Sequence, residues 1–243
     1  MVRTQADDDS DRKLLADVDS HGWHLVAIRD APDDPPYVFS VGIYHTLGQP
    51  ELCIFGLSSA NAMGTILNGI GELMRGGETF QDWHESEDVL EGYACMFRRV
   101  DPRHYAEYFG YARWFHESDD FPMLQCVWPD REGRFPWDPM SESNQLVLAE
   151  QDAWPFNEGK NRGVFTTRQV IEEGHPVLVV SHDEDDDWQF LCGTTDDPDD
   201  ARLVALSSVV ESHPTVAELA GLPLGWQAYR NTPGDPWQRE QAD

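Results

Sequence analysis

The sequence predicts an α+β protein built from two modules. Strand-like and helix-like segments intermingle without the regular alternation that marks a parallel α/β sheet. Residues 139–163 lose this periodicity and separate two self-contained apolar patterns. With 243 residues, 40% of them hydrophobic, and nine tryptophans, the chain can bury two cores. We therefore expect an N-terminal antiparallel sheet or split barrel with two packed helices, followed by a smaller α+β module.

Composition sets the expected domain boundaries. Residues 1–10 are polar and acidic, which predicts a disordered tail ahead of a first domain at 11–140. Residues 141–162 are expected to be a linker, because their apolar residues follow neither helical nor strand spacing. The second module then spans residues 163–243.

Three helices are predicted in the first domain. A short one at 11–20 ends near Gly22, a residue type suited to helix C-terminal caps. The clearest lies between Ser59 and Gly76, where apolar residues follow the i, i+3, i+4, i+7 spacing of one face. A third, at 104–115, is aromatic on most of its surface and should be buried.

The strands of the first domain are bounded by Gly, Pro and acidic residues. The 45–50 connection is short, which predicts that the strands on either side of it are antiparallel neighbours. A mobile acidic segment is expected at 78–88. The predicted strands lie at 23–28, 37–44, 51–57, 92–100 and 121–128.

The second module centres on a predicted hairpin. A strand at 175–182 pairs with 188–193 across the acidic turn Asp183 to Asp187. A second acidic loop spans 196–200. If the two loops are adjacent, their field should accelerate association with a basic partner. The remaining elements are a helical turn at 169–174, a short helix at 214–222 and a last strand at 225–230.

Several N-terminal motifs carry a family resemblance. His21-Gly22-Trp23-His24, Phe39-Ser40-Val41-Gly42-Ile43, Gly48-Gln49-Pro50-Glu51-Leu52, His104 to Gly110, and the run from Trp128-Pro129-Asp130 to Pro136-Trp137-Asp138 occur in this order. Over roughly residues 10–140 the chain thereby resembles the bacterial domain-of-unknown-function 4262 family. That family usually has His where this chain has Gln49, so a metal or proton-transfer role for that histidine does not carry over. The resemblance implies no activity.

The C-terminal part is similar to the bacterial immunity protein 33 family. The similarity lies in Asp187 to Thr194, Leu203 to Val210, and Pro214 to Leu222 before Gly225-Trp226. It implies an inhibitor that neutralises a toxin by tight binding.

The charge of the chain restricts its partners. Its 45 acidic and 17 basic residues give a net charge of −28. Such a surface repels nucleic acids and anionic membranes, whereas a basic protein is steered towards it. An acidic surface that serves solubility alone remains the alternative.

Cysteine usage and the absence of targeting signals predict a cytoplasmic protein. No apolar run approaches membrane-spanning length, and the first residues lack the apolar core of a secretion signal. The four cysteines stand singly in apolar segments, which is typical of reduced, buried thiols. They are Cys53, Cys95, Cys126 and Cys192.

No metal or cofactor site is expected from the motifs. The nine histidines do not follow ligand spacing, and His21 and His24 need not share a face. The run Asp183 to Asp187 lacks the alternating ligands, Gly and Glu of a calcium loop. Phosphate-binding, dinucleotide and nucleophile-elbow motifs are absent from the sequence.

The leading functional hypothesis is a cytoplasmic protein-binding module of the immunity or antitoxin type that acts on a basic protein. Tryptophan and exposed carboxylates would form its interface. The expected partner-binding residues are Asp183, Asp185, Asp186, Asp187, Trp188, Asp197 and Asp199.

The alternative hypothesis is a small-molecule enzyme or cofactor-binding protein with its site in the N-terminal domain. Titratable residues from separate segments would converge there. The candidate catalytic residues are His24, His45, Glu51, His104 and Asp130. The candidate pocket-lining residues are Tyr44, Trp128 and Trp137.

Overall fold

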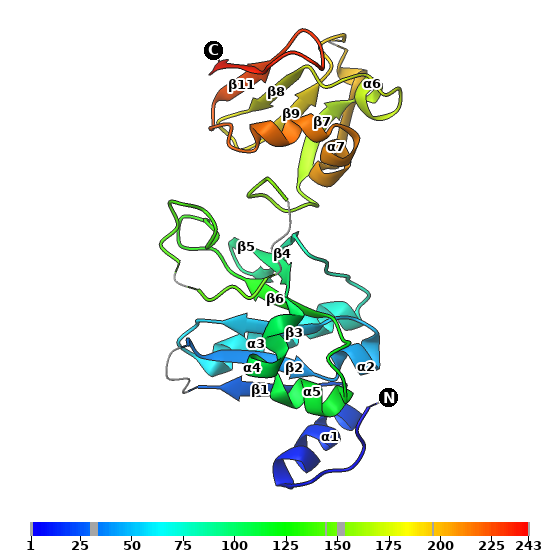
Figure 1. Cartoon of the computed structure of the whole chain (residues 1–243), viewed down its shortest axis with the longest axis vertical. Coiled ribbons are helices and arrows are strands. Elements are labelled where there is room, and N and C mark those ends of the chain that lie inside the picture. The colour runs from blue at the N-terminus through cyan, green and yellow to red at the C-terminus, as the bar shows by residue number, and fades with distance from the viewer. Residues whose placement is uncertain (1, 30–33, 144, 150–153, 196, 243) are drawn as a thin grey trace. The chain divides into compact units, whose positions relative to one another are not determined.

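The computed structural model describes residues 2–29, 34–143, 145–149, 154–195 and 197–242. The chain divides into two units, Met1–Asp152 and Ala153–Asp243. Each unit contains one six-stranded mixed sheet with helices, so the predicted α+β class is confirmed (Figure 1). Neither sheet closes into a barrel, and the split-barrel alternative is therefore wrong.

The N-terminal sheet has the strand order β1-β2-β3-β6-β5-β4. Its neighbours are antiparallel except for β3 and β6, which run parallel. The predicted antiparallel pairing across the 45–50 connection is confirmed, and a short helix, α2 (Ile43–Leu47), lies within that connection. The strands are β1 (His24–Ile28), β2 (Tyr37–Val41), β3 (Glu51–Phe55), β4 (His84–Leu90), β5 (Tyr93–Arg99) and β6 (Met123–Val127).

Helices cover both faces of this sheet (Figure 1). Helix α3 (Ala60–Arg75) packs on one face, where its predicted apolar stripe meets Val38 and Ile54. Helices α1 (Asp9–His21), α4 (Tyr105–Tyr108) and α5 (Gly110–His116) contribute to the cluster on the other face. Every residue of β2, β3 and β6 is buried, because both faces of these central strands are covered.

Three local expectations for this unit are corrected. The proposed tail is anchored: the N–H of Arg3 donates to the carbonyl of Phe115 at 2.8 Å, and α1 already begins at Asp9. The acidic segment at 78–88 enters strand β4 at His84. The aromatic helix breaks at Phe109, whose backbone leaves the helical region, into α4 and α5.

The segment expected to be a linker contributes to both units. Leu148 is buried in the N-terminal core, and its N–H donates to the Gln125 side chain at 2.9 Å. Phe156 is buried in the C-terminal core. Residues 144 and 150–153 of this segment lie outside the described residues.

The C-terminal sheet has the order β10-β7-β9-β8-β11-β12, with β7 and β9 parallel. The predicted β8–β9 hairpin is confirmed by the pairs Val180 with Phe190 and His182 with Trp188. Its strands are β7 (Gly163–Thr167), β8 (Val179–His182), β9 (Trp188–Leu191), β10 (Ala201–Ala205), β11 (Trp226–Tyr229) and β12 (Gln238–Gln241).

Short helices supply one side of the C-terminal core. Val170, Val209 and Leu219 from these helices are buried with Val180 and Phe190 of the sheet. The helices are α6 (Arg168–Ile171), α7 (Leu206–Ser212) and the 3₁₀ helices η2 (Pro198–Asp200) and η3 (Pro214–Leu219); a further 3₁₀ helix, η1 (Pro102–His104), belongs to the N-terminal unit.

All four cysteines are buried, as predicted. Among the described residues, no helix combines the length and the apolar character needed to cross a membrane.

Candidate functional site

The β8–β9 turn is held by its own aspartates. Oδ1 of Asp183 accepts the N–H groups of Asp185 and Asp187 at 3.0 and 2.9 Å. Asp186 adopts a positive φ of 67°, a conformation that aspartate tolerates better than most residues. The acidic run therefore forms a defined turn, and part of its acidity serves to build it.

His182, the last residue of β8, is buried directly beneath this turn. Its ring stacks on Trp188 with 4.1 Å between the centroids. Nδ1 lies 2.8 Å from the carbonyl oxygen of Leu222, and Nε2 lies 2.9 Å from Oδ1 of Asp186. Because a carbonyl oxygen only accepts, Nδ1 carries a hydrogen and Nε2 is the nitrogen that faces the carboxylate.

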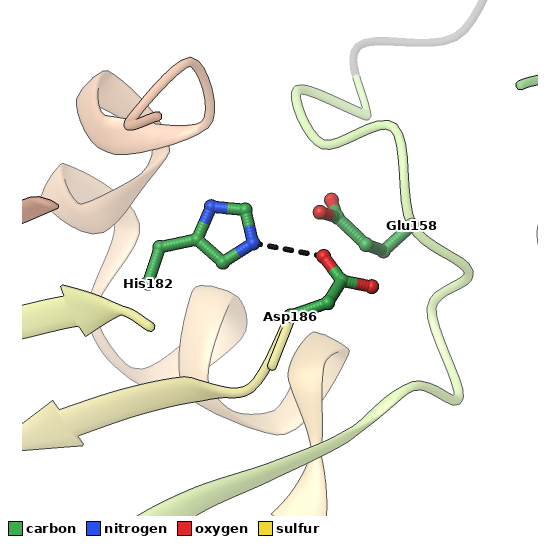
Figure 2. Close-up of side chains that lie close together, drawn as sticks. All are labelled: Glu158, His182 and Asp186. Carbon is green, nitrogen blue, oxygen red and sulfur yellow. Dashed lines mark hydrogen bonds and ion pairs between the residues drawn. The ribbon is translucent and has the colours of Figure 1, made fainter. Parts of the chain in front are cut away.

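Glu158 brings a second carboxylate to His182 (Figure 2). Its Oε1 accepts the indole N–H of Trp188 at 3.0 Å. Its Oε2 is buried and has no hydrogen-bond partner within the described structure. Glu158, His182 and Asp186 each present one ligand atom, and these atoms lie within 4.8 Å of one another.

The charges of this cluster reinforce one another. Burial lowers the pKa of His182, but hydrogen bonds to Asp186 and to the Leu222 carbonyl outweigh it and raise the pKa overall. The hydrogen bond from His182, together with Arg162, lowers the pKa of Asp186. Arg162 donates to Oδ2 of Asp186 at 3.0 Å. The arrangement suits a charged imidazolium between carboxylates or a cation in its place.

The second acidic loop is engaged differently. Oδ1 of Asp197 accepts the N–H of Asp199 at 3.0 Å and thereby caps η2. Asp200 accepts from the side chains of Arg168, Gln169 and Thr195. Residue 196 lies outside the described residues.

The two acidic loops are not adjacent, so the condition for a combined field is not met. The first precedes Trp188 at the start of β9, whereas the second follows Leu191 at its end. The second loop leads into strand β10, whose first residue, Ala201, pairs with Thr167 at the C-terminal end of β7. Because β7 and β9 are parallel, this is also the side of the sheet where β9 ends. The body of the sheet therefore separates them.

The expected partner-binding residues divide by exposure. Asp185, Asp186, Asp197 and Asp199 are exposed, and Asp183 and Asp187 are half-buried. Trp188 is only 1% exposed and packs against Phe156 and Phe190, so it is part of the core in the unbound chain. Its indole contributes to the core because alternate residues of β9 face inwards.

The candidate catalytic residues of the N-terminal unit do not form one site. His24 lines a groove of about 720 Å³ between α1 and α3, while His45 lines another beside Phe115. Asp130 and Trp128 line a third groove, of about 420 Å³. The ring of His104 lies against Tyr108. The structure therefore places these candidates in separate parts of the unit.

The remaining candidates have structural contacts. Asp130 accepts N–H groups from residues 132, 134 and 142 and so organises its own loop. Trp137 packs against Phe135 and Trp83. Tyr44 is 39% exposed, and its ring lies 5.9 Å from that of His116.

Glu51 forms a closed buried cluster. It is completely inaccessible and accepts from Ser40 Oγ at 2.6 Å, from the N–H of Gly42 at 2.7 Å and from Nε2 of His116 at 2.9 Å. Further N–H groups, those of Ile43 and Tyr44, lie at 3.3 Å. This carboxylate holds α2 and α5 to the sheet rather than facing a groove.

Sequence reasoning missed Glu158, His182, His116 and Asp17 as site residues. Glu158 lay in the presumed linker, and His182 looked like an ordinary strand residue. A histidine four positions before an aspartate across a tight turn was the available local signal. Asp17 is close to His24: its Oδ2 lies 2.6 Å from Nδ1 of His24.

The comparisons with known proteins assign the N-terminal unit. The model of a family described as a domain of unknown function, DUF4262, matches residues 17–142, just over half of the chain. The chain belongs to the DUF4262 family. The predicted family resemblance is thus confirmed. The matched region contains the Glu51 cluster and every residue that lines the His24 groove except Lys13.

The DUF4262 match ends before the C-terminal unit, so the His182 cluster lies outside it. Nothing supports the expected similarity of that unit to immunity protein 33. No curated protein and no solved structure matches this chain.

Proposed function

We propose that this DUF4262 protein is an acidic binding protein for a basic protein partner, which docks on the β8–β9 turn. The observation that carries the proposal is the turn itself. Glu184 and Asp185 are exposed there, and neither forms an ion pair within the described part of the chain. Unpaired carboxylates on a defined turn are available to lysine and arginine side chains of a partner.

An apolar residue borders these carboxylates. Leu224 is 54% exposed. A side chain placed at the next residue, Gly225, would meet Cγ of Glu184 at 3.5 Å, so this backbone lies beside the turn. An exposed leucine next to charged groups provides the mixture of apolar and polar contacts that protein interfaces use.

The charge of the whole chain favours the same partner. A net charge of −28 steers basic proteins towards the surface and repels nucleic acids. The finer form of the proposal is an immunity or antitoxin role, in which the basic partner is a toxin. That form draws only on the charge of the chain, which suits a basic toxin as it suits any basic protein.

Zero-length cross-linking tests the docking site. The full chain is used to capture partners from its native cells, and a carbodiimide then couples its carboxylates to lysines in contact with them. We expect cross-links from Glu184 or Asp185 to partner lysines. Asp197 and Asp199 are the internal control, because they are also exposed but lie at the opposite end of β9. Cross-links confined to that control loop, or capture of no basic protein, would refute the proposal and favour the solubility alternative.

A second candidate function is supported by the His24 groove. Asp17 holds Nδ1 of His24 at 2.6 Å, and Nε2 has no hydrogen-bond partner among the described residues. Nε2 could then act as a general base in a groove also lined by Trp23, Asn68 and Arg75. A small-molecule enzyme of this kind should retain its ligand in native mass spectrometry. His24→Gln should lose that ligand, whereas His104→Gln should keep it, since His104 is outside the groove.

A further inference from the structure

The cluster of Glu158, His182 and Asp186 joins three separate parts of the C-terminal unit. Glu158 precedes β7, His182 ends β8 and Asp186 lies in the β8–β9 turn. Their nearest ligand atoms are within 4.8 Å of one another. The ligand atoms of a tetrahedral zinc ion lie about 2.0–2.2 Å from the metal and roughly 3.5 Å from one another. Side-chain movements of about 1 Å would therefore bring these three ligand atoms to that spacing.

The tautomer and orientation of His182 suit metal ligation. Its Nδ1–H donates to the Leu222 carbonyl at 2.8 Å, which places the lone pair of the neutral ring on Nε2. The ring is fixed by stacking on Trp188 at 4.1 Å. Metal-bound histidines commonly donate their other N–H to a backbone carbonyl in this way.

Each carboxylate is oriented through one oxygen by a donor other than His182, and the other oxygen of Asp186, Oδ1, faces Nε2 of His182. Trp188 binds Oε1 of Glu158, and Arg162 binds Oδ2 of Asp186. The second oxygen of Glu158, Oε2, is buried without a hydrogen-bond partner in the described structure. A buried carboxylate oxygen without a partner is costly, and a cation beside it would remove that cost.

We propose that Nε2 of His182, Oδ1 of Asp186 and Oε2 of Glu158 bind one divalent transition-metal cation, with water completing its coordination. One imidazole and two carboxylates favour Zn²⁺, Co²⁺ or Mn²⁺. Ca²⁺ and Mg²⁺ are disfavoured, because they prefer a larger set of oxygen ligands. This site is separate from the proposed docking residues Glu184 and Asp185, so either proposal can fail without the other.

Isothermal titration of the full chain, freed of metal with a chelator, tests the site. We expect one equivalent of Zn²⁺ to bind and Ca²⁺ not to compete at the same concentration. Glu158→Gln keeps an oxygen for the Trp188 N–H and removes the charged ligand, and it should weaken Zn²⁺ binding by at least about tenfold. Glu184→Gln is the matched control: it removes the same charge beside the turn and should leave binding unchanged.

Cobalt spectroscopy supplies a second readout. Co²⁺ should give visible d–d absorption bands whose positions shift in His182→Asn, since the nitrogen ligand is lost. Circular dichroism checks that His182→Asn folds. If it does not fold, the Co²⁺ spectrum of Glu158→Gln is compared with that of the unchanged chain instead. Three results would overturn the proposal: no stoichiometric Zn²⁺ binding by the unchanged chain, unaltered binding by Glu158→Gln, or an equal loss in Glu184→Gln, which would indicate diffuse attraction to the acidic surface.

Discussion

Nε2 of His116 lies 2.9 Å from Oε1 of Glu51 in the interior of the N-terminal unit, although 65 positions separate the two residues. Glu51 also accepts from Ser40 and Gly42, and it has no exposed surface. One carboxylate thus ties strand β3 to α2 and α5. The stability of the DUF4262 region should depend on it.

Glu51→Ala should reduce the free energy of unfolding by about 3–5 kcal/mol, because it leaves several buried donors without an acceptor. Urea denaturation followed by tryptophan fluorescence measures the change. Glu107→Ala, an exposed glutamate on α4, should change stability by less than about 0.5 kcal/mol. Similar effects of both substitutions would show that the Glu51 cluster is not structural.

Two glycines of α3 should respond in opposite directions to alanine. A Cβ at Gly71 would lie 2.6 Å from Cζ2 of Trp23, whereas a Cβ at Gly69 would meet nothing within 4 Å. Gly71→Ala should therefore destabilise by about 1–3 kcal/mol through overpacking. Gly69→Ala should stabilise by about 0.5–1 kcal/mol, because alanine favours helix. Thermal unfolding of the two variants decides the point, and stabilisation by Gly71→Ala would contradict the packing.

The fold could be predicted where its determinants are local. The β8–β9 hairpin follows from alternating apolar residues on both sides of an acidic turn, and α3 follows from its apolar stripe. The parallel pairing of β3 with β6 joins residues about 70 positions apart, such as Glu51 and Met123, and no local pattern specifies it. The two acidic loops are close in sequence because only strand β9 separates them. An extended strand holds the loops at its two ends apart, on opposite sides of the sheet.

The candidate site was less predictable than the fold. Residue type alone indicated acidic loops, yet Asp183 and Asp197 are used to cap their own turns. The contact between Glu158 and His182 depends on a segment that has no regular structure and therefore no periodicity to recognise. The candidate histidines were chosen for their chemistry, and the fold places them on separate elements: His24 on β1, His45 on α2 and His104 on η1.

Alkaline pH should weaken the N-terminal unit through Tyr37. Burial, and then the nearby Tyr108 and Asp34, raise the pKa of Tyr37 to about 12 from 10.0. Between these values the unfolded chain releases the phenolic proton and the folded chain keeps it. The stabilisation is therefore present below pH 10 and is lost as the pH rises towards 12.

The Tyr37 effect amounts to about 1.4 kcal/mol between pH 8 and pH 11. Phenylalanine at position 37 cannot ionise. Between pH 8 and pH 11 the free energy of unfolding of Tyr37→Phe should therefore fall by about 1.4 kcal/mol less than that of the unchanged protein. Urea denaturation of both proteins at the two pH values provides the comparison. Equal losses in both would mean that Tyr37 ionises alike in the folded and unfolded states.

The rate at which the captured basic partner associates, measured by stopped flow from 0.1 to 1 M salt, tests the proposed docking turn most directly. Glu184→Gln with Asp185→Asn should slow association about three- to tenfold at 0.1 M salt and flatten its salt dependence. Asp197→Asn with Asp199→Asn removes the same charge at the other end of β9 and should leave the rate close to that of the unchanged protein. Equal rates for the two double variants would contradict the assignment of docking to the β8–β9 turn.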